Sequence, residues 1–257
     1  MKKRFLSFLI ISFLLIGCLE TTEGLLINEN GSGIYTMEID ISGMFTLMGM
    51  MKTEDSTVGS GVPADRKNFD STVLFKSFID TATDLTNEEK ALLRNAKAHI
   101  KMNEKEKIFK VTMTYPFSRL TDVAKIIALD GSGKGSNAVQ QIFKGNTASQ
   151  DTSVVEPTLP NYTDMYQMTY TDGLLERKIK PEKLKEFEDQ FKMAGENGME
   201  EMISSIKINS VINLPRPAKL VKGEKVNLSG NKKTVTINCT MKDILANPKA
   251  VEYSIQY

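Results

Sequence analysis

Short runs of alternating apolar and polar residues, separated by turn-forming residues, constrain the fold of this 257-residue chain more than any other feature. A glycine-rich turn between two such runs is typical of a β-hairpin. Three pairs of runs predict hairpins: 25–28 with 34–41, 98–103 with 109–115, and 165–171 with 174–179. Alternation returns in five C-terminal segments, 206–209, 211–214, 226–228, 234–239 and 251–257. The sequence therefore predicts an antiparallel β-sheet with a polar outer face.

Helices are predicted between the hairpins. Thr86-Asn87-Glu88-Glu89 has the form of a capping box and predicts a helix start. Residues 118–129 carry apolar residues at helical spacing, and Pro181 suits the first position of a helix that continues through Leu184. The expected fold class is therefore α+β, an antiparallel sheet built from hairpins with inserted helices.

Two segments have no apolar periodicity and are dense in glycine, serine or proline, at about 52–67 and 130–160. We expect both to be mobile loops, because a long segment without periodicity in a compact domain is either functional or disordered. The length of the chain after the leader suits one mid-sized domain or two small ones with a substantial core. We expect residues 25–257, with these two loops, to form one α+β domain.

The N-terminus reads as an export signal. Lys2, Lys3 and Arg4 form a basic start, and Phe5 to Ile16 is almost unbroken apolar sequence. This run is too short to span a bilayer stably and is followed by a small residue, so residues 1–17 are predicted to be a secretory signal peptide.

Gly17-Cys18 resembles the lipobox of bacterial lipoproteins. The resemblance implies a diacylglyceryl thioether on Cys18, usually with an N-acyl group such as palmitate, and residues 18–24 as the lipidated N-terminus and tether. The alternative is an ordinary signal peptide whose cleavage site lies near a cysteine. The expected location is the bacterial cell envelope, with the protein membrane-anchored by lipid. No aspartate follows Cys18, so the inner-membrane retention signal of some Gram-negative families is missing. In a Gram-negative organism we therefore expect the periplasmic face of the outer membrane.

A second resemblance begins after the anchor. Residues 28–33, Asn-Glu-Asn-Gly-Ser-Gly, between two strands look like the opening of LppM-like bacterial envelope lipoproteins, and the late Leu214-Pro215 before short strands is similar too. Asn30 stands where such proteins often have aspartate, and the middle of the chain is not covered. The resemblance implies a fold and an envelope location, and no activity.

Charge and cysteine content narrow the function classes. Removing the leader leaves 30 basic against 32 acidic residues, and this balance gives no electrostatic footprint for nucleic acid. If Cys18 carries lipid, Cys239 has no disulfide partner. Its strand pattern places it with Val235 and Ile237, so we expect a buried, unreactive thiol.

The sequence contains no catalytic constellation that we could assign. His99 is the only histidine, which argues against a multi-histidine metal site or a serine triad, and its strand position predicts a solvent-facing residue. Gly131-Ser132-Gly133-Lys134-Gly135-Ser136 lacks the first glycine of a phosphate loop, with Ala128 in its place. We expect no metal and no cofactor.

One apolar segment is a candidate binding surface. Met44, Met48 and Met51 lie in a compact run after the first hairpin, predicted to be a short helix. Thioether side chains form adaptable apolar surfaces that suit a protein partner or hydrophobic ligand. The alternative is that they fill the core beneath the sheet.

Two function hypotheses follow. The first is a non-catalytic binding or structural module, membrane-anchored in the envelope, with a protein or hydrophobic ligand as partner. The second is an envelope enzyme such as a carboxylate-dependent glycan hydrolase, which would need two carboxylates at glycosidase separation in a cleft.

Overall fold

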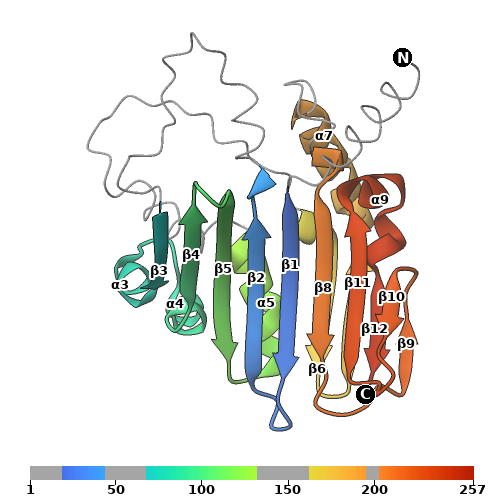
Figure 1. Cartoon of the computed structure of the whole chain (residues 1–257). Helices are drawn as coiled ribbons and strands as arrows, with labels where there is room; N and C mark the ends of the chain where they lie inside the picture. Colours follow the sequence, from blue (N-terminus) through green and yellow to red (C-terminus); the bar gives the residue numbers. More distant parts are fainter. Residues whose placement is uncertain (1–18, 44–67, 132–161, 195–202) are drawn as a thin grey trace, which may run out of the picture.

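The computed structural model describes residues 19–43, 68–131, 162–194 and 203–257, which form two β-sheets (Figure 1). Sheet A has eight strands, in the order β10 (Val226–Leu228), β11 (Thr234–Thr240), β8 (Lys207–Asn213), β1 (Glu20–Ile27), β2 (Gly33–Asp40), β5 (Ile108–Phe117), β4 (Lys97–Asn103) and β3 (Asn68–Leu74). Sheet B has four, in the order β6 (Tyr166–Thr171), β7 (Leu174–Ile179), β12 (Tyr253–Gln256) and β9 (Leu220–Lys222).

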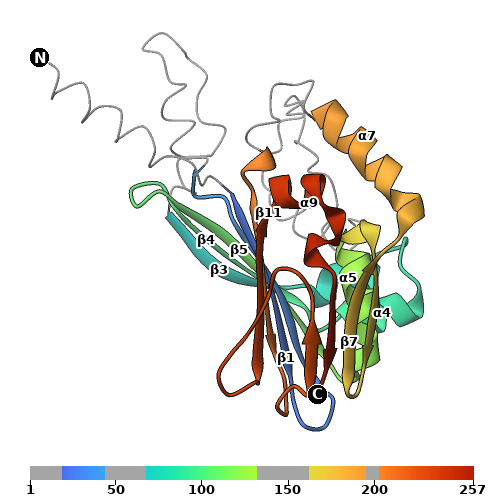
Figure 2. The ribbon, with the colours of Figure 1, turned by 90° about the vertical axis from the view of Figure 1, so that its right-hand side faces the viewer.

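Helices lie with sheet B on one side of sheet A, whereas the opposite, outer face of sheet A carries no described helix or strand (Figure 2). The α-helices are α3 (Lys76–Thr81), α4 (Asn87–Leu93), α5 (Val123–Gly131), α7 (Leu184–Ala194) and α9 (Met241–Ala246). Single 3₁₀ turns are η3 (Leu120–Asp122), η4 (Tyr162–Met165), η5 (Pro181–Lys183) and η7 (Pro248–Val251).

All three predicted hairpins are present and antiparallel: β1 with β2, β4 with β5, and β6 with β7. In the first, the Asn28 N–H donates to the Ser32 carbonyl and the Gly31 N–H donates to the Asn28 carbonyl. Gly31 has φ +78°, a conformation that glycine adopts without steric cost. The turn residues therefore set the register of the two central strands.

The pairing of β1 corrects two expectations. Its start at Glu20 precedes the expected start at Leu25, so residues 20–24, predicted as a tether, lie inside the sheet. β1 also pairs in parallel with β8, with Glu20 opposite Lys207. Sheet A is thus mixed and not purely antiparallel, and the long chain segment between β1 and β8 makes their parallel pairing possible.

The capping box predicted at Thr86 is confirmed: its side chain accepts from the Glu89 N–H, and Glu89 accepts from the Thr86 N–H. Pro181 begins η5, which leads into α7 as expected. The predicted helix at 118–129 exists but starts later, as η3 followed by α5. Capping signals and apolar residues at helical spacing were therefore sufficient to find these helices.

The core lies between the sheets and under the helices. Leu25, Tyr35 and Tyr115 on the inner face of sheet A are buried, as are Leu175 and Ile255 on sheet B. Val123, Ile126 and Ile127 of α5 belong to the same buried cluster. Burial of apolar area between these layers is the main favourable contribution to the fold.

The structure supports an α+β fold that is dominated by strands, mostly antiparallel, in two sheets where the sequence predicted one. The sequence did not reveal β3, β9, α3 or α9. Residues 130 and 131, predicted to begin the second loop, belong to α5 instead. The rest of that loop at 132–160, the predicted loop at 52–67, and residues 44–51 of the short helix predicted over 43–51 lie outside the described residues.

Candidate functional site

The residues singled out from the sequence fall in different places. Cys18, Met44, Met48 and Met51 lie outside the described residues, so neither lipidation nor the apolar surface is tested here. His99 is solvent-facing as predicted, with Nε2 2.7 Å from Oδ1 of Asp70. Both of these side chains are about half exposed, at 46% and 60%. We therefore assign His99 to the solvated face and not to a catalytic site.

Cys239 is buried, as predicted, on the inner face with Val235 and Ile237. Its Sγ lies 3.6 Å from the Ile208 carbonyl oxygen. Burial raises the pKa of the thiol to about 12. Because the thiolate is the nucleophile, this cysteine is unsuited to covalent chemistry.

The outer face of sheet A carries a row of charged residues at the end where β1 begins. Six neighbouring strands contribute one residue each, in register, and we call them the charged row: Lys207, Glu20, Asp40, Lys110, Lys101 and Asp70. With three lysines and three carboxylates, the row is balanced in charge. At a strand spacing of about 4.8 Å it extends for roughly 24 Å.

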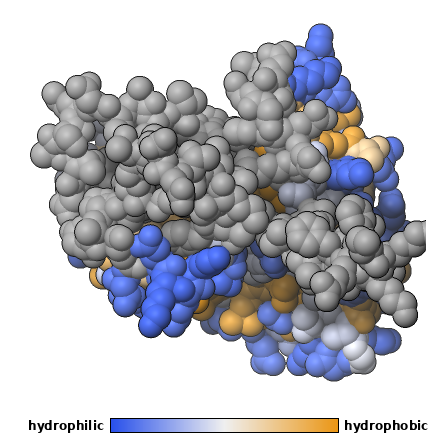
Figure 3. Space-filling view, turned by 45° about the horizontal axis from the view of Figure 1, so that its top comes forward, coloured by the Kyte–Doolittle hydropathy of each residue, from blue (hydrophilic) through white to orange (hydrophobic). Residues whose placement is uncertain are grey.

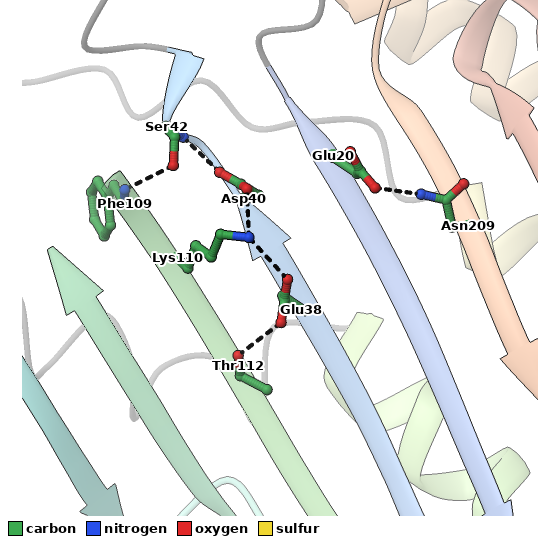
Figure 4. A network of polar contacts seen from close by, with 8 residues as sticks. All are labelled: Glu20, Glu38, Asp40, Ser42, Phe109, Lys110, Thr112 and Asn209. Atoms are coloured by element: carbon green, nitrogen blue, oxygen red, sulfur yellow. Dashed lines mark hydrogen bonds and ion pairs between the residues drawn. The ribbon is translucent and has the colours of Figure 1, made fainter. Parts of the chain in front are cut away.

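A polar network fixes the centre of this row (Figure 4). The Lys110 ammonium lies 2.8 Å from Asp40 and 3.5 Å from Glu38, while the Thr112 hydroxyl donates to Glu38. Ser42 links the strand end: its N–H donates to Asp40, and its hydroxyl accepts from the Phe109 N–H. These bonds hold the end of β2 against the start of β5.

The protonation of the pair follows from these contacts. Burial alone would raise the pKa of Asp40, but hydrogen bonds from Lys110 and Ser42 outweigh it and lower the pKa below its usual value. The hydrogen bond to Asp40 raises the pKa of Lys110. Both groups are therefore charged near neutral pH, and Asp40 is not poised to donate a proton as a general acid would be.

Polarity falls along the outer face away from the charged row. The next row is mainly amides and hydroxyls: Asn209, Thr22, Glu38, Thr112, His99 and Thr72. At the far end, Leu26 and Ile34 are paired and 44% and 37% exposed. In the space-filling view, hydrophilic residues gather over the β3–β4–β5 side of the molecule, at the lower left (Figure 3).

A second polar cluster lies buried between the sheets. Arg177 on β7 donates from Nη2 to Oε2 of Glu23 on β1 at 2.5 Å, and the Ser210 hydroxyl donates to the same oxygen. The guanidinium also lies over the rings of Tyr253 and Tyr166, at 5.4 and 5.9 Å from their centroids. This arrangement satisfies a buried charge with an ion pair and aromatic faces.

The hydroxyls of Tyr170 and Tyr253 lie 2.6 Å apart beside this pair. Burial raises the pKa of both phenols, so they stay protonated. The cavity lined by Glu23, Ser210, Tyr170 and other core residues measures about 10 Å³, the space of one water molecule. It is far too small for an organic ligand, so we interpret this cluster as structural.

Two further observations concern only the described residues. They contain no group of three or more histidine, cysteine, aspartate or glutamate side chains placed to hold a metal ion. No helix among them has both the length and the apolar character needed to cross a bilayer.

Comparisons with known proteins found one weak structural similarity and no match in sequence. No protein-family model and no curated protein matches the chain. Among solved structures, it is similar to the NMR structure of the folded domain of LppM from Mycobacterium tuberculosis, with a TM-score of 0.36, 7% identity, and coverage of 93% of this chain and 89% of that one. This similarity is too low to establish a common fold or function, so membership of that group stays a prediction.

The charged row could not be found from the sequence, although each of its residues is visible there. Alternation shows that Asp40 and Lys110 lie on polar faces of their strands. Their alignment across six strands depends on register, and register depends on pairings between distant segments. The site that the structure adds is thus a product of sheet topology.

Proposed function

We propose that this chain is a lipoprotein of the bacterial cell envelope, exported by its leader, anchored through lipid on Cys18, and acting as a non-catalytic binding or structural module. The leader sequence carries this proposal, and one structural observation bears on how the anchor would be attached to the domain. Leu19 is buried, at 7% exposed, and its carbonyl oxygen accepts from the Lys207 N–H at 3.0 Å. The residue after Cys18 is therefore already part of the fold.

The burial of Leu19 leaves no free chain between the anchor cysteine and the domain. Adjacent Cα atoms are about 3.8 Å apart, so the anchor cysteine is covalently held at the end of a central strand. Two or more acyl chains give stable membrane attachment, whereas one chain gives only marginal binding. A lipidated Cys18 would hold the rigid sheet directly at the bilayer surface, without a flexible tether.

The test is Cys18→Ala in the full chain. We expect an unprocessed or soluble protein that no longer partitions into the detergent phase, because the lipid supplies the membrane affinity. Mass spectrometry of the wild-type N-terminus should show the acyl groups. Cys239→Ala is the matched control and should partition like the wild type. Unchanged partitioning of Cys18→Ala would overturn the anchoring proposal.

We propose the run Met44–Met51, with Met44, Met48 and Met51, as the surface that binds a protein or hydrophobic ligand. If this run faces a groove, Met44→Glu with Met48→Glu should reduce binding of a hydrophobic fluorescent probe while the melting temperature stays near wild type. If the run fills the core, buried unpaired charges should unfold the domain instead. Unfolding of the variant would reject the surface.

We prefer a binding module to the alternative of a glycan hydrolase. Glycosidases need one carboxyl whose pKa is raised, acting as general acid, beside an ionised one. The neighbouring carboxylates Glu38 and Asp40 share Lys110, and the pKa of Asp40 is lowered. Hydrolysis of a peptidoglycan preparation by the purified protein, lost in Asp40→Asn, would favour the enzyme reading.

A further inference from the structure

We propose that the end of sheet A bearing the charged row is the surface that rests on the membrane, in contact with phosphate headgroups. This inference rests on the proposed lipid anchor and adds to it an orientation and a contact surface. The occupant is the headgroup surface of the phospholipid bilayer that holds the anchor.

Strand direction determines which residues share this end. β1 and β8 begin here, β2 and β11 end here, and the β4–β5 turn at 103–107 lies beside them, at the top of Figure 1. The C-terminus and the turn at 229–233 lie at the opposite end. Cys18 directly precedes Leu19 and the start of β1. Acyl chains on Cys18 that insert into the bilayer would therefore keep this end of sheet A facing the membrane.

The chemistry of this end suits a headgroup surface. Charged side chains are costly in hydrocarbon, so the charged row favours resting on the bilayer over insertion into it. The carboxylates of Asp40 and Glu38 are already bonded to Lys110. Among the described residues, no carboxylate lies within ion-pair distance of Lys105 or Lys207. These lysines can therefore offer ammonium groups to lipid phosphates.

The chain contains a matched pair of lysines for testing the orientation. Lys107 and Lys232 are both exposed, both in tight turns, and both have positive φ, 55° and 58°. Each backbone N–H donates to the carbonyl three residues earlier, Glu104 for Lys107 and Ser229 for Lys232. They differ chiefly in position, since Lys107 lies at the charged-row end and Lys232 at the other end.

The experiment uses the lipidated full chain in vesicles of phosphatidylcholine and phosphatidylglycerol, with a fluorophore on Lys107→Cys or on Lys232→Cys. The quencher is a nitroxide attached to a lipid headgroup. We expect several-fold stronger quenching at position 107 than at position 232. Adding Lys105→Glu and Lys207→Glu should reduce quenching at 107, because the headgroup contact is weakened, while the melting temperature stays near wild type.

The outcomes separate the two proposals. Equal quenching at the two positions, or stronger quenching at 232, with acyl groups present on Cys18, would overturn the orientation and leave the lipid anchor intact. Absence of acyl groups on Cys18 would overturn both. Stronger quenching at 107 that does not change with Lys105→Glu and Lys207→Glu would overturn the lysine contacts.

Discussion

Arg177 and Glu23 form a buried ion pair that joins the two sheets, with side chains 2% and 5% exposed and 2.5 Å between Nη2 and Oε2. They are 154 residues apart in the chain. A buried charge is costly without a partner of opposite charge, so each side chain depends on the other to remain buried. The pair therefore couples the packing of sheet B to the central strand of sheet A.

Arg177→Ala should lower the free energy of unfolding by about 3–5 kcal/mol, because it leaves the Glu23 carboxylate buried without its cation. Urea unfolding followed by circular dichroism measures the change. Lys178→Ala is the control on the same strand: Lys178 is 64% exposed and forms a surface ion pair with Glu176, so the loss should be at most about 1 kcal/mol. Equal losses in the two variants would contradict the role of the buried pair.

Replacing both partners tests whether the loss in the single variant comes from the charge that is left buried alone. Arg177→Met combined with Glu23→Leu should be more stable than either single variant, since no charge is left buried alone. A double-mutant cycle on the free energies of unfolding gives the coupling between the residues. Additive losses would show that the two side chains act independently.

Gly33 at the start of β2 has no room for a side chain. A Cβ there would lie 2.0 Å from the Leu26 carbonyl oxygen and 2.5 Å from Cζ of Phe117. Gly33→Ala should therefore destabilise the protein by about 1–3 kcal/mol, the usual cost of overpacking. Gly230→Ala, where nothing lies within 4 Å of the added atom, should leave the melting temperature nearly unchanged. A melting temperature of Gly33→Ala equal to wild type would refute the steric argument.

The stability of the Asp40–Lys110 contact should depend on pH in acid. The pKa of Asp40 in the folded protein lies below its ordinary value of 3.8. The ionised carboxylate therefore stabilises the fold fully above its ordinary pKa. This stabilisation is lost as the pH falls through the pKa of the folded state. Asp40→Asn should lose less stability than the wild type when the pH is lowered from about 5 to 2. Urea midpoints across this range measure the effect, with Asp189→Asn on α7 as the control. Parallel curves for wild type and Asp40→Asn would contradict it.

Cys239 should resist thiol reagents in the native protein. With its pKa raised to about 12 by burial, the group is almost entirely a protonated, inaccessible thiol at neutral pH. A colourimetric disulfide reagent should therefore react slowly until urea unfolds the chain. Lys232→Cys, exposed in a turn, provides the fast native control. Rapid reaction of Cys239 without denaturant would show that this part of the core opens readily.

Local patterns in the sequence determined much of the fold. The turn at Asn28–Ser32 fixes the first hairpin, the side chains of Thr86 and Glu89 start α4, and alternation puts Cys239 on the inner face. These features depend on residues close together in the chain, so propensity and periodicity suffice to predict them. The weakly apolar alternation of β3 gave no comparable signal.

Only the tertiary structure decided the features that join distant segments. The parallel pairing of β1 with β8, the burial of Arg177 against Glu23, and the alignment of the charged row depend on long-range pairing. In the sequence, Arg177 lies between Glu176 and Lys178 and reads as one charge among several on a solvated strand. Its environment is set by a partner 154 residues away, whose position no local pattern encodes.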